Sequence, residues 1–257
     1  MSEAWRAFAA EVARWRDAGR VVEFWWRDDD ATRPVPELAR LFALAAASDV
    51  PLALAVVPEG AVPELFAGIG KGVSVLQHGV DHVNRAVEGE KKTEFSGGEP
   101  VDGAIARLSS GRARLEALAG ARAIPVLAPP WNRIHAALVP RLGAAGLRGL
   151  STYGARTALS TAPGITRINT HVDIVAWRSG CGFVGDEQAL GLAVRHLAAR
   201  RAGTIDADEP TGWLTHHARH DAAAWEFLAR LFEVTRSTPG VRWRRAEDLF
   251  GIVNRGR

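Results

Sequence analysis

Three consecutive aspartates follow Arg27 at the end of the apolar, strand-like run 21–26. Neighbouring carboxylates repel one another, and carboxylates beside a buried segment are costly unless a positive charge neutralises them. A bound cation is the simplest source of that charge. We therefore expect one of Asp28, Asp29 and Asp30 to bind a metal ion and a neighbour to act as a base, with Arg27 as a charge partner. A helix cap alone would need fewer acidic residues.

Two later segments carry histidines that suit the same ion. His78 and His82 are four residues apart, and on one helical turn both imidazoles would lie on the same face. The pair His216-His217 follows the apolar run 212–215. A histidine at a strand end is suited to act as a general acid near neutral pH. The three segments together predict a hydrolase with one divalent metal.

Strand-like and helix-like segments alternate along the chain, which is typical of parallel β/α units. Expected strands lie at 21–26, 52–57, 73–77, 124–128, 149–152, 168–175 and 212–215. Expected helices lie at 3–18, 37–47, 62–67, 101–119, 136–145, 186–201 and 221–235, and a last strand and helix share 241–250. Seven or eight units favour a (β/α) barrel, which we expect to form one domain spanning 1–257. Each polar cluster directly follows a strand, and in a parallel barrel that end is the catalytic face.

Composition excludes several classes of protein. The net charge of +3 comes without a cluster of Lys and Arg along one face, so no nucleic-acid partner is expected. No apolar run reaches the roughly 18 residues that span a membrane. The N-terminal segment lacks the apolar core of a secretory signal, so the cytoplasm is the expected location. The single cysteine, Cys181, excludes an intrachain disulfide. The oligomeric state is not predicted.

Further polar and aromatic side chains are expected around the metal. The stiff segment Pro129-Pro130-Trp131-Asn132-Arg133 follows a strand. Trp131 could stack on a sugar ring and Arg133 could orient a carboxylate. The same segment is equally compatible with a rigid turn that carries a surface arginine. His171, Asp173 and Trp177 could line the pocket or tune the acid. His135 and His196 are expected on helix surfaces.

The order of these motifs resembles the polysaccharide deacetylase family, of carbohydrate esterase type. The matching features are an Asp-Asp pair after the first strand, His-x-x-x-His after the third, a Pro-Pro loop after the fourth and Leu214-Thr215-His216 near the end. The resemblance covers roughly residues 21–220. It implies an irregular seven-stranded (β/α) barrel and a metal-dependent deacetylase, usually with zinc.

The resemblance also implies roles for particular residues. His78 and His82 match the two histidine ligands, and His216 matches the acid, with His217 as the alternative. The aspartate triplet leaves two registers open. In the preferred register Asp29 is the base and Asp30 the metal ligand; in the other these roles fall on Asp28 and Asp29.

The chain also departs from the family pattern. Ala128 replaces the family's arginine in the proline motif, and Arg27 or Arg133 could substitute for it. The family's Asp-Trp motif is matched only by the wider spacing of Asp173 and Trp177. We expect Trp131, Arg133, Arg27 and His217 to contact the substrate.

The expected reaction is removal of an acetyl group from an N- or O-acetylated sugar or polysaccharide precursor. Two alternatives remain at this point. One is a metal-dependent amidohydrolase that acts on a small non-sugar amide. The other is a carbohydrate-binding protein that keeps the barrel without catalysis.

Overall fold

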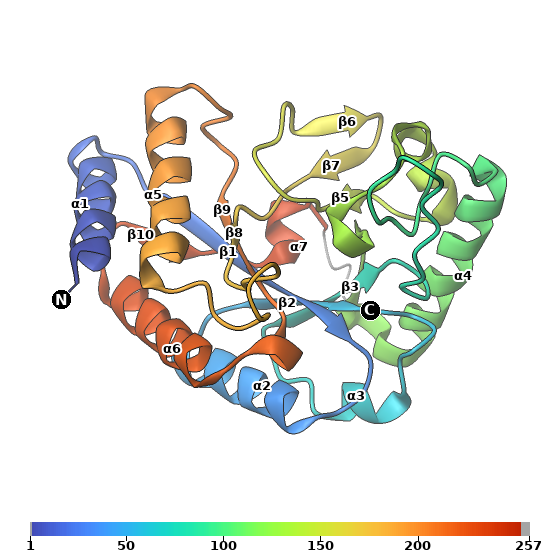
Figure 1. The fold of residues 1–257 in the computed structure, drawn as a ribbon, viewed down its shortest axis with the longest axis horizontal. Coiled ribbons are helices and arrows are strands. Elements are labelled where there is room, and N and C mark those ends of the chain that lie inside the picture. Colours follow the sequence, from blue (N-terminus) through green and yellow to red (C-terminus); the bar gives the residue numbers. More distant parts are fainter. Residues whose placement is uncertain (1, 253–257) are drawn as a thin grey trace.

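The computed structural model describes residues 2–252 and contains a single mixed sheet (Figure 1). Its strands are β1 (Val22–Ala31), β2 (Leu52–Val56), β3 (Val73–His78), β4 (Ala123–Ala128), β5 (Gly149–Leu150), β6 (Ser160–Ala162), β7 (Ile165–Arg167), β8 (Val172–Asp173), β9 (Thr211–Thr215) and β10 (Val241–Trp243). The strand order is β6-β7-β5-β4-β3-β2-β1-β9-β8, and β10 pairs with the start of β1. Within residues 2–252, every strand pair is parallel except the β6–β7 hairpin.

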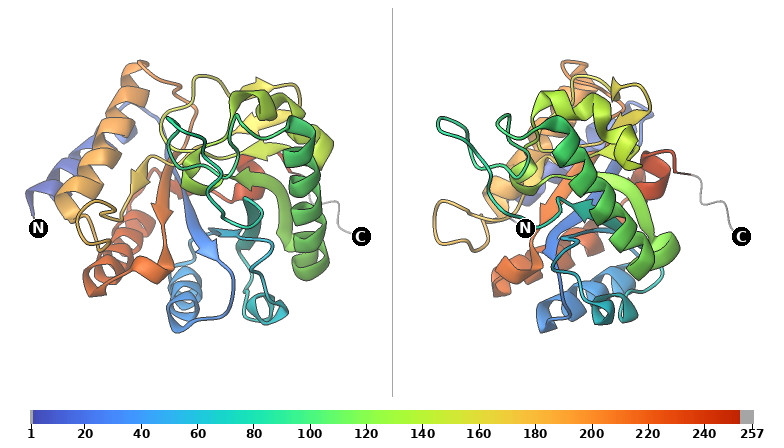
Figure 2. Two further views of the ribbon diagram at one scale, coloured as in Figure 1. Left: turned by 45° about the vertical axis from the view of Figure 1, so that its right-hand side comes forward. Right: turned by 90° about the vertical axis from the view of Figure 1, so that its right-hand side faces the viewer.

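Helices cover the outside of the curved sheet (Figure 2). They are α1 (Glu3–Asp17), α2 (Pro36–Ser48), α3 (Pro63–Ala67), α4 (Val101–Ala119), α5 (Asp186–Ala202), α6 (Ala222–Ser237) and α7 (Ala246–Leu249). Short 3-10 helices are η1 (Gly120–Arg122), η2 (Pro130–Asn132), η3 (Ala136–Ala145) and η4 (His217–Arg219). Helices α1 and α5 lie side by side, and α4 covers the opposite part of the sheet. Of these helices, none is long and apolar enough to cross a membrane.

The apolar strands and helix faces predicted from the sequence form the core. All five residues of β2 are buried, as expected for a strand covered on both faces. The two tryptophans of β1, Trp25 and Trp26, are also buried and belong to the core. The amphipathic helix α1 packs Trp5 and Phe8 against the same core.

The predicted α/β class with a parallel sheet is confirmed, with differences in detail. Within the described residues the strands do not close into a ring by strand pairing, and the isolated bridge Tyr153↔Thr170 lies between the segments after β5 and before β8. The β6–β7 hairpin was not predicted because its strands are only three residues long. The 136–145 helix is a 3-10 helix that contains Pro140, which cannot donate a backbone hydrogen bond. Residue 1 and residues 253–257, the ends of the predicted domain, lie outside the described residues.

Candidate active site

The aspartate triplet lies within β1 and not after it, and a bulge orients its side chains. In a regular strand, Asp29 and Asp30 would point to opposite faces of the sheet. The register between β1 and β2 shifts between Asp28 and Ala31, and Asp30 has a φ of 73°. Aspartate tolerates this left-handed conformation better than most residues. As a result Asp29 and Asp30 both line one pocket, whereas Asp28 lies outside its lining.

Asp30 meets the two histidines of the His-x-x-x-His motif. Its Oδ1 lies 3.0 Å from Nε2 of His78 and 3.3 Å from Nε2 of His82. Nδ1 of His78 lies 2.9 Å from the carbonyl oxygen of Ala128. Because a carbonyl can only accept, that nitrogen carries the proton, and in the neutral ring Nε2 is left with its lone pair facing Asp30. Burial raises the pKa of Asp30, but His78 and His82, when they are protonated and no metal ion is bound, outweigh burial through hydrogen bonds and charge and hold that pKa below its usual value.

Two of these three ligand atoms are buried without a hydrogen-bond partner, namely Oδ1 of Asp30 and Nε2 of His78. Two facing acceptors repel unless a proton or a cation lies between them. With His82 the group offers three ligand atoms within 4.8 Å of one another. Two histidines and one carboxylate form a ligand set that catalytic zinc sites use, so these residues fit a divalent metal.

The segment that carries His82 is not helical, contrary to the expectation for the i, i+4 pair. His78 ends β3, and the chain then turns through Gly79 and His82, which have φ values of 61° and 58°. The buried carboxylate of Glu94 holds this turn. It accepts backbone N–H groups from Val80, Asp81 and His82. Sequence reasoning missed Glu94, because nothing in the polar loop distinguishes it from the neighbouring glutamates.

Arg27 is fully buried and neutralises Asp29. Its Nε and one terminal nitrogen donate to the two carboxylate oxygens of Asp29 at 2.8 and 2.9 Å. The guanidinium also donates to Oδ1 of Asn132 at 2.6 Å and to Oγ of Ser151 at 2.7 Å. This fork-to-fork geometry is the strongest that an arginine and a carboxylate can form. The pair fixes the carboxylate of Asp29 at the inner wall of the pocket.

Asp28 points to the opposite side of β1 and pairs with His217. Its Oδ1 lies 2.5 Å from Nδ1 of His217, and its Oδ2 accepts the hydroxyl of Thr215 at 2.6 Å. Burial would raise the pKa of Asp28, but His217 outweighs that effect and lowers it. Burial would lower the pKa of His217, but the charge of Asp28 raises it above its ordinary value. The pair ties the end of β9 to β1.

His216 lies on the pocket side of the same strand end. Its buried Nδ1 has no hydrogen-bond partner within the described residues, and its ring packs edge-on against Trp177 with centroids 4.7 Å apart. Nε1 of Trp177 donates to Oδ2 of Asp173 at 2.8 Å. Burial raises the pKa of Asp173, and the charge of His216 opposes that rise. The Asp173 and Trp177 pair expected from the sequence therefore borders the histidine expected to act as acid.

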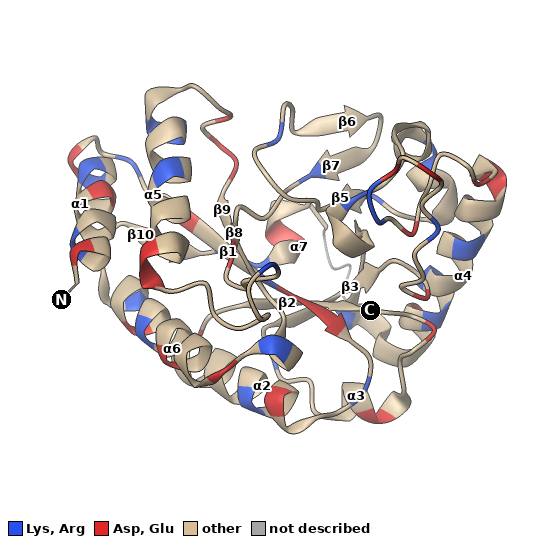
Figure 3. Ribbon diagram, viewed as in Figure 1, with Lys and Arg blue, Asp and Glu red and all other residues tan. Residues whose placement is uncertain are grey.

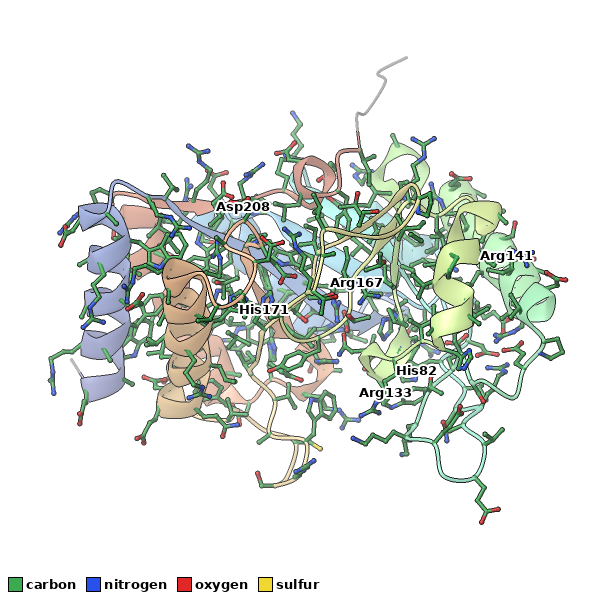
Figure 4. All side chains as sticks on the ribbon, turned by 90° about the horizontal axis from the view of Figure 1, so that it is seen from above. His82, Arg133, Arg141, Arg167, His171 and Asp208 are labelled. Atoms are coloured by element: carbon green, nitrogen blue, oxygen red, sulfur yellow. The ribbon has the colours of Figure 1, made fainter. Side chains whose placement is uncertain are left out.

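These side chains surround an open pocket of about 850 Å³. His82 and Arg133, on the segments after β3 and β4, both line it, and Figure 4 labels them near one another. The pocket wall includes the expected Trp131, whose ring lies 4.5 Å from that of His82. It also includes Tyr153, Arg178 and Arg219, which were not singled out from the sequence. The volume suits a ligand of one or a few sugar rings.

A second group of possible ligands, His171, His196 and Glu209, lies outside this pocket and is fully enclosed. The backbone N–H of Gly212 donates to Nδ1 of His171 at 3.0 Å, so the neutral ring must carry its proton on Nε2, which faces Glu209 at 3.3 Å. A protonated Nε2 cannot bind a metal, and we assign this group a structural role. His196, expected on a helix surface, is buried because its ring stacks on His171 at 3.5 Å.

These buried histidines predict a loss of stability in acid. Burial lowers the pKa of His196 from 6.5 to about 2 and also lowers the pKa of His171. Below pH 6.5 the unfolded chain binds protons that the folded chain does not, so the free energy of unfolding should fall as pH falls. His196 alone should lower the free energy of unfolding by about 1.4 kcal/mol for each pH unit below 6.5.

Urea unfolding between pH 7 and 4.5 measures this effect. His196→Gln should make the pH dependence shallower by about one proton, whereas His135→Gln, a change at an exposed histidine, should leave it as in the unmodified chain. If the free energy of unfolding changes equally with pH in all three proteins, His196 is not the buried neutral histidine that we infer.

Comparison with solved structures identifies the fold. The chain aligns with a Mycobacterium smegmatis protein described provisionally as a polysaccharide deacetylase, at a TM-score of 0.64 and 16% identity, over 91% of this chain and 90% of that one. A Pseudomonas aeruginosa PAO1 protein, described in the same provisional way, aligns at a TM-score of 0.60 and 16% identity, over 91% of each chain. The chain has the polysaccharide deacetylase fold. A family 4 carbohydrate esterase from Streptomyces lividans, in complex with acetate, shares this fold at a TM-score of 0.54 and 14% identity. The alignment covers 86% of this chain and 90% of the esterase.

No family model matches the sequence, and no curated protein matches it either. With structural relatives at 14 to 16% identity, the resemblance is confirmed at the level of the polysaccharide deacetylase fold.

The expected site residues fall into two groups within this deacetylase fold. The pocket brings together seven of them: Asp29, Asp30, His78, His82, Trp131, Arg133 and His216. Arg27 and His217, expected to contact the substrate, lie outside the lining because each is buried against an aspartate of β1. Of the two candidates for the missing family arginine, Arg27 is the one that contacts Asp29. Arg133 donates instead to the carbonyl oxygen of Lys92 at 3.0 Å.

Proposed function

We propose that this chain is a metal-dependent hydrolase that removes acetyl groups from an N- or O-acetylated saccharide. The observation that carries the proposal is the convergence of Asp30, His78 and His82 beside Asp29 and His216 in one open pocket. Each group suits a separate part of acyl transfer to water. The shared fold with deacetylases and carbohydrate esterases supports the same reaction class.

Asp30, His78 and His82 would hold the metal through one carboxylate oxygen and two imidazole nitrogens. A divalent metal bound there supplies Lewis-acid polarisation of the acetyl carbonyl and a lower pKa for water. The Ala128 carbonyl supports this role, because it orients the ring of His78 and keeps its Nε2 free of a proton. Zinc is the ion that this ligand set suits best.

Asp29 would act as the base. Its carboxylate lies next to Asp30 in the pocket wall and receives two hydrogen bonds from Arg27. It accepts a proton from the attacking water as the oxygen bonds to the acetyl carbon. Arg27 contributes by holding the carboxylate in one orientation, so that a lone pair remains directed into the pocket. This is the positioning task that the family's missing arginine would otherwise perform.

His216 would act as the acid. It lines the pocket at the end of β9, the strand that pairs with β1, and its ring is oriented by Trp177. The imidazole donates a proton to the nitrogen or oxygen that leaves the acetyl group, as the bond to the acetyl carbon breaks. Trp177 is itself held by Asp173, so both residues act as positioning groups for His216.

Metal content is the first test. Purified protein should contain about one divalent ion per chain, and His78→Ala should lose it, because two of three protein ligands bind such an ion poorly. His135→Ala is the matched control, since His135 is exposed and caps η3, so its metal content should equal that of the unmodified protein. Elemental analysis measures all three proteins directly.

Activity is the second part of the same test. Metal-loaded protein should release acetate from acetylated sugars, and His78→Ala should not. Release of acid from small non-sugar amides, with acetylated sugars inert, would assign the chain to the amidohydrolase alternative. Protein that stays free of metal even after zinc is added would contradict the proposal and favour a carbohydrate-binding protein.

A further inference from the structure

The pocket carries three arginines that take no part in the chemistry above. Arg133 follows β4, Arg178 lies in the loop after β8, and Arg219 lies on η4 after β9. All three side chains belong to exposed residues and come from separate parts of the chain. Figure 3 shows basic residues on the loop after β8 and on η4, next to the acidic end of β1. The rim of the pocket is therefore positively charged on several sides.

The acidic side chains of the pocket do not neutralise these arginines, because each already has other partners. Asp29 is bound by Arg27 through both oxygens. Asp30 faces His78 and His82. Asp173 accepts hydrogen bonds from the indole of Trp177 and from a backbone N–H. A metal ion at the aspartate and histidines would add further positive charge.

Two of the three arginines are free to bind a ligand. Across residues 2–252, no side-chain hydrogen bond, ion pair or ring contact involves the guanidinium of Arg178 or that of Arg219, whereas Arg133 makes one hydrogen bond to a backbone carbonyl. Several other arginines of this chain hold carboxylates, among them Arg27, Arg107, Arg156 and Arg201. Unpaired arginines at a pocket rim are suited to an anion from solution, since the guanidinium fork matches the oxygens of a carboxylate or a phosphate.

Both free arginines are close in sequence to a residue that contacts His216 or to His216 itself. Arg178 directly follows Trp177, whose ring contacts His216, and Arg219 lies on the turn that begins at His216. An anion held by them would lie on the side of the pocket where the proposed acid protonates the leaving group. It would therefore belong to the saccharide and not to the departing acetate.

We propose that the saccharide taken by this pocket carries an anionic group, a carboxylate or a phosphate, and that Arg178 and Arg219 bind it. The proposal rests on the proposed deacetylase function for the acetyl group. It assigns specificity to two residues that lie outside the metal ligands, the base and the acid. The aromatic rings of Trp131, Trp177 and Tyr153 in the same pocket offer surfaces for the sugar itself.

Matched sugars test the charge requirement. The substrates are N-acetylglucosamine, N-acetylglucosamine 6-phosphate and N-acetylmuramic acid, which are neutral, phosphorylated and carboxylated. With zinc-loaded protein, kcat/KM for acetate release should be at least about tenfold higher for an anionic sugar than for the neutral one. Whichever of the two anionic sugars has the higher kcat/KM shows whether the pocket prefers a phosphate or a carboxylate.

Arginine variants connect the preference to the two residues. Arg178→Gln and Arg219→Gln should each lower kcat/KM for the anionic sugar about tenfold and change that for the neutral sugar less than about twofold. Arg141→Gln is the control, because Arg141 is exposed, paired with Asp102 and not among the residues that line the pocket; Figure 4 shows it apart from His82 and Arg133. A higher salt concentration should lower kcat/KM for the anionic sugars and leave that for the neutral sugar unchanged.

Binding of the deacetylated sugars to the unmodified protein separates this proposal from the function. Glucosamine, glucosamine 6-phosphate and muramic acid need no turnover, and calorimetry should show tighter binding of an anionic member. If acetate is released equally from neutral and anionic sugars, the deacetylase function stands and the anion proposal is wrong. If no sugar is hydrolysed, the function fails. Calorimetry then tests the anion site alone. Equal binding of neutral and anionic sugars would overturn the anion proposal. The same holds if the Arg178 and Arg219 variants bind the anionic sugars as tightly as Arg141→Gln does.

Discussion

Asp29→Asn is expected to lower kcat for acetate release roughly a hundredfold to ten-thousandfold while the protein keeps its metal. An amide cannot accept the proton of the attacking water, but it has nearly the shape of the carboxylate and can still accept from Arg27. Asp29 is not one of the three side chains whose ligand atoms converge. Steady-state kinetics and elemental analysis on the same preparation measure both effects.

Asp30→Asn is the matched variant. It changes the neighbouring aspartate in the same chemical way, yet it should lose metal and activity together, because Oδ1 of Asp30 faces both histidines. The opposite pattern, with metal lost in Asp29→Asn and kept in Asp30→Asn, would support the other register of the triplet. In that register Asp28 is the base, although its carboxylate is turned toward His217 and Thr215. Full activity in Asp29→Asn would contradict both registers.

Arg27→Met is expected to lower the free energy of unfolding by about 3–5 kcal/mol. The side chain is fully buried, and its removal leaves the carboxylate of Asp29 in the protein interior without its neutralising partner. Asn132 and Ser151 lose a hydrogen-bond donor at the same time. Urea or thermal unfolding of the purified variant measures the loss, and metal-free protein should be used so that metal binding does not offset it.

Two further variants separate charge from packing. Arg27→Met combined with Asp29→Asn should recover a large part of the lost stability, because the remaining buried group is then neutral. Arg141→Met removes one partner of an ion pair in which both side chains are exposed, and it should cost less than about 1 kcal/mol. A double variant no more stable than Arg27→Met would show that the arginine stabilises the fold by packing alone.

Much of the fold was predictable from local signals. The run that forms β2 is apolar at every position, and strands and helices alternate along the chain, so a parallel α/β sheet followed from hydrophobic pattern and element order. The chemistry-bearing residues also stood out, because charged side chains directly after or within buried strands are rare unless they have partners. The β6–β7 hairpin escaped notice, since three-residue strands carry almost no periodic signal.

The arrangement within the site was less predictable. The His-x-x-x-His spacing favours a helical turn, yet Glu94, twelve residues beyond His82, holds a non-helical turn through backbone N–H groups. Arg27 and His217 carry charges that would suit a ligand, but each faces an aspartate of β1. Such pairings depend on contacts between residues distant in the chain, which no local pattern contains.

The sequence by itself determined the order of strands and helices and the set of residues able to bind a metal or transfer protons. Only the tertiary structure decided which aspartate meets the histidines. The pairing of β1 with β2 shifts register between Asp28 and Ala31, whereas the pairing of β1 with β9 is regular and ends at Asp28. That bulge sends two adjacent carboxylates into the pocket and the third to His217. A strand's side-chain alternation is a local property, whereas a bulge arises from pairing between distant segments, and therefore the division of roles within the triplet depends on the folded sheet.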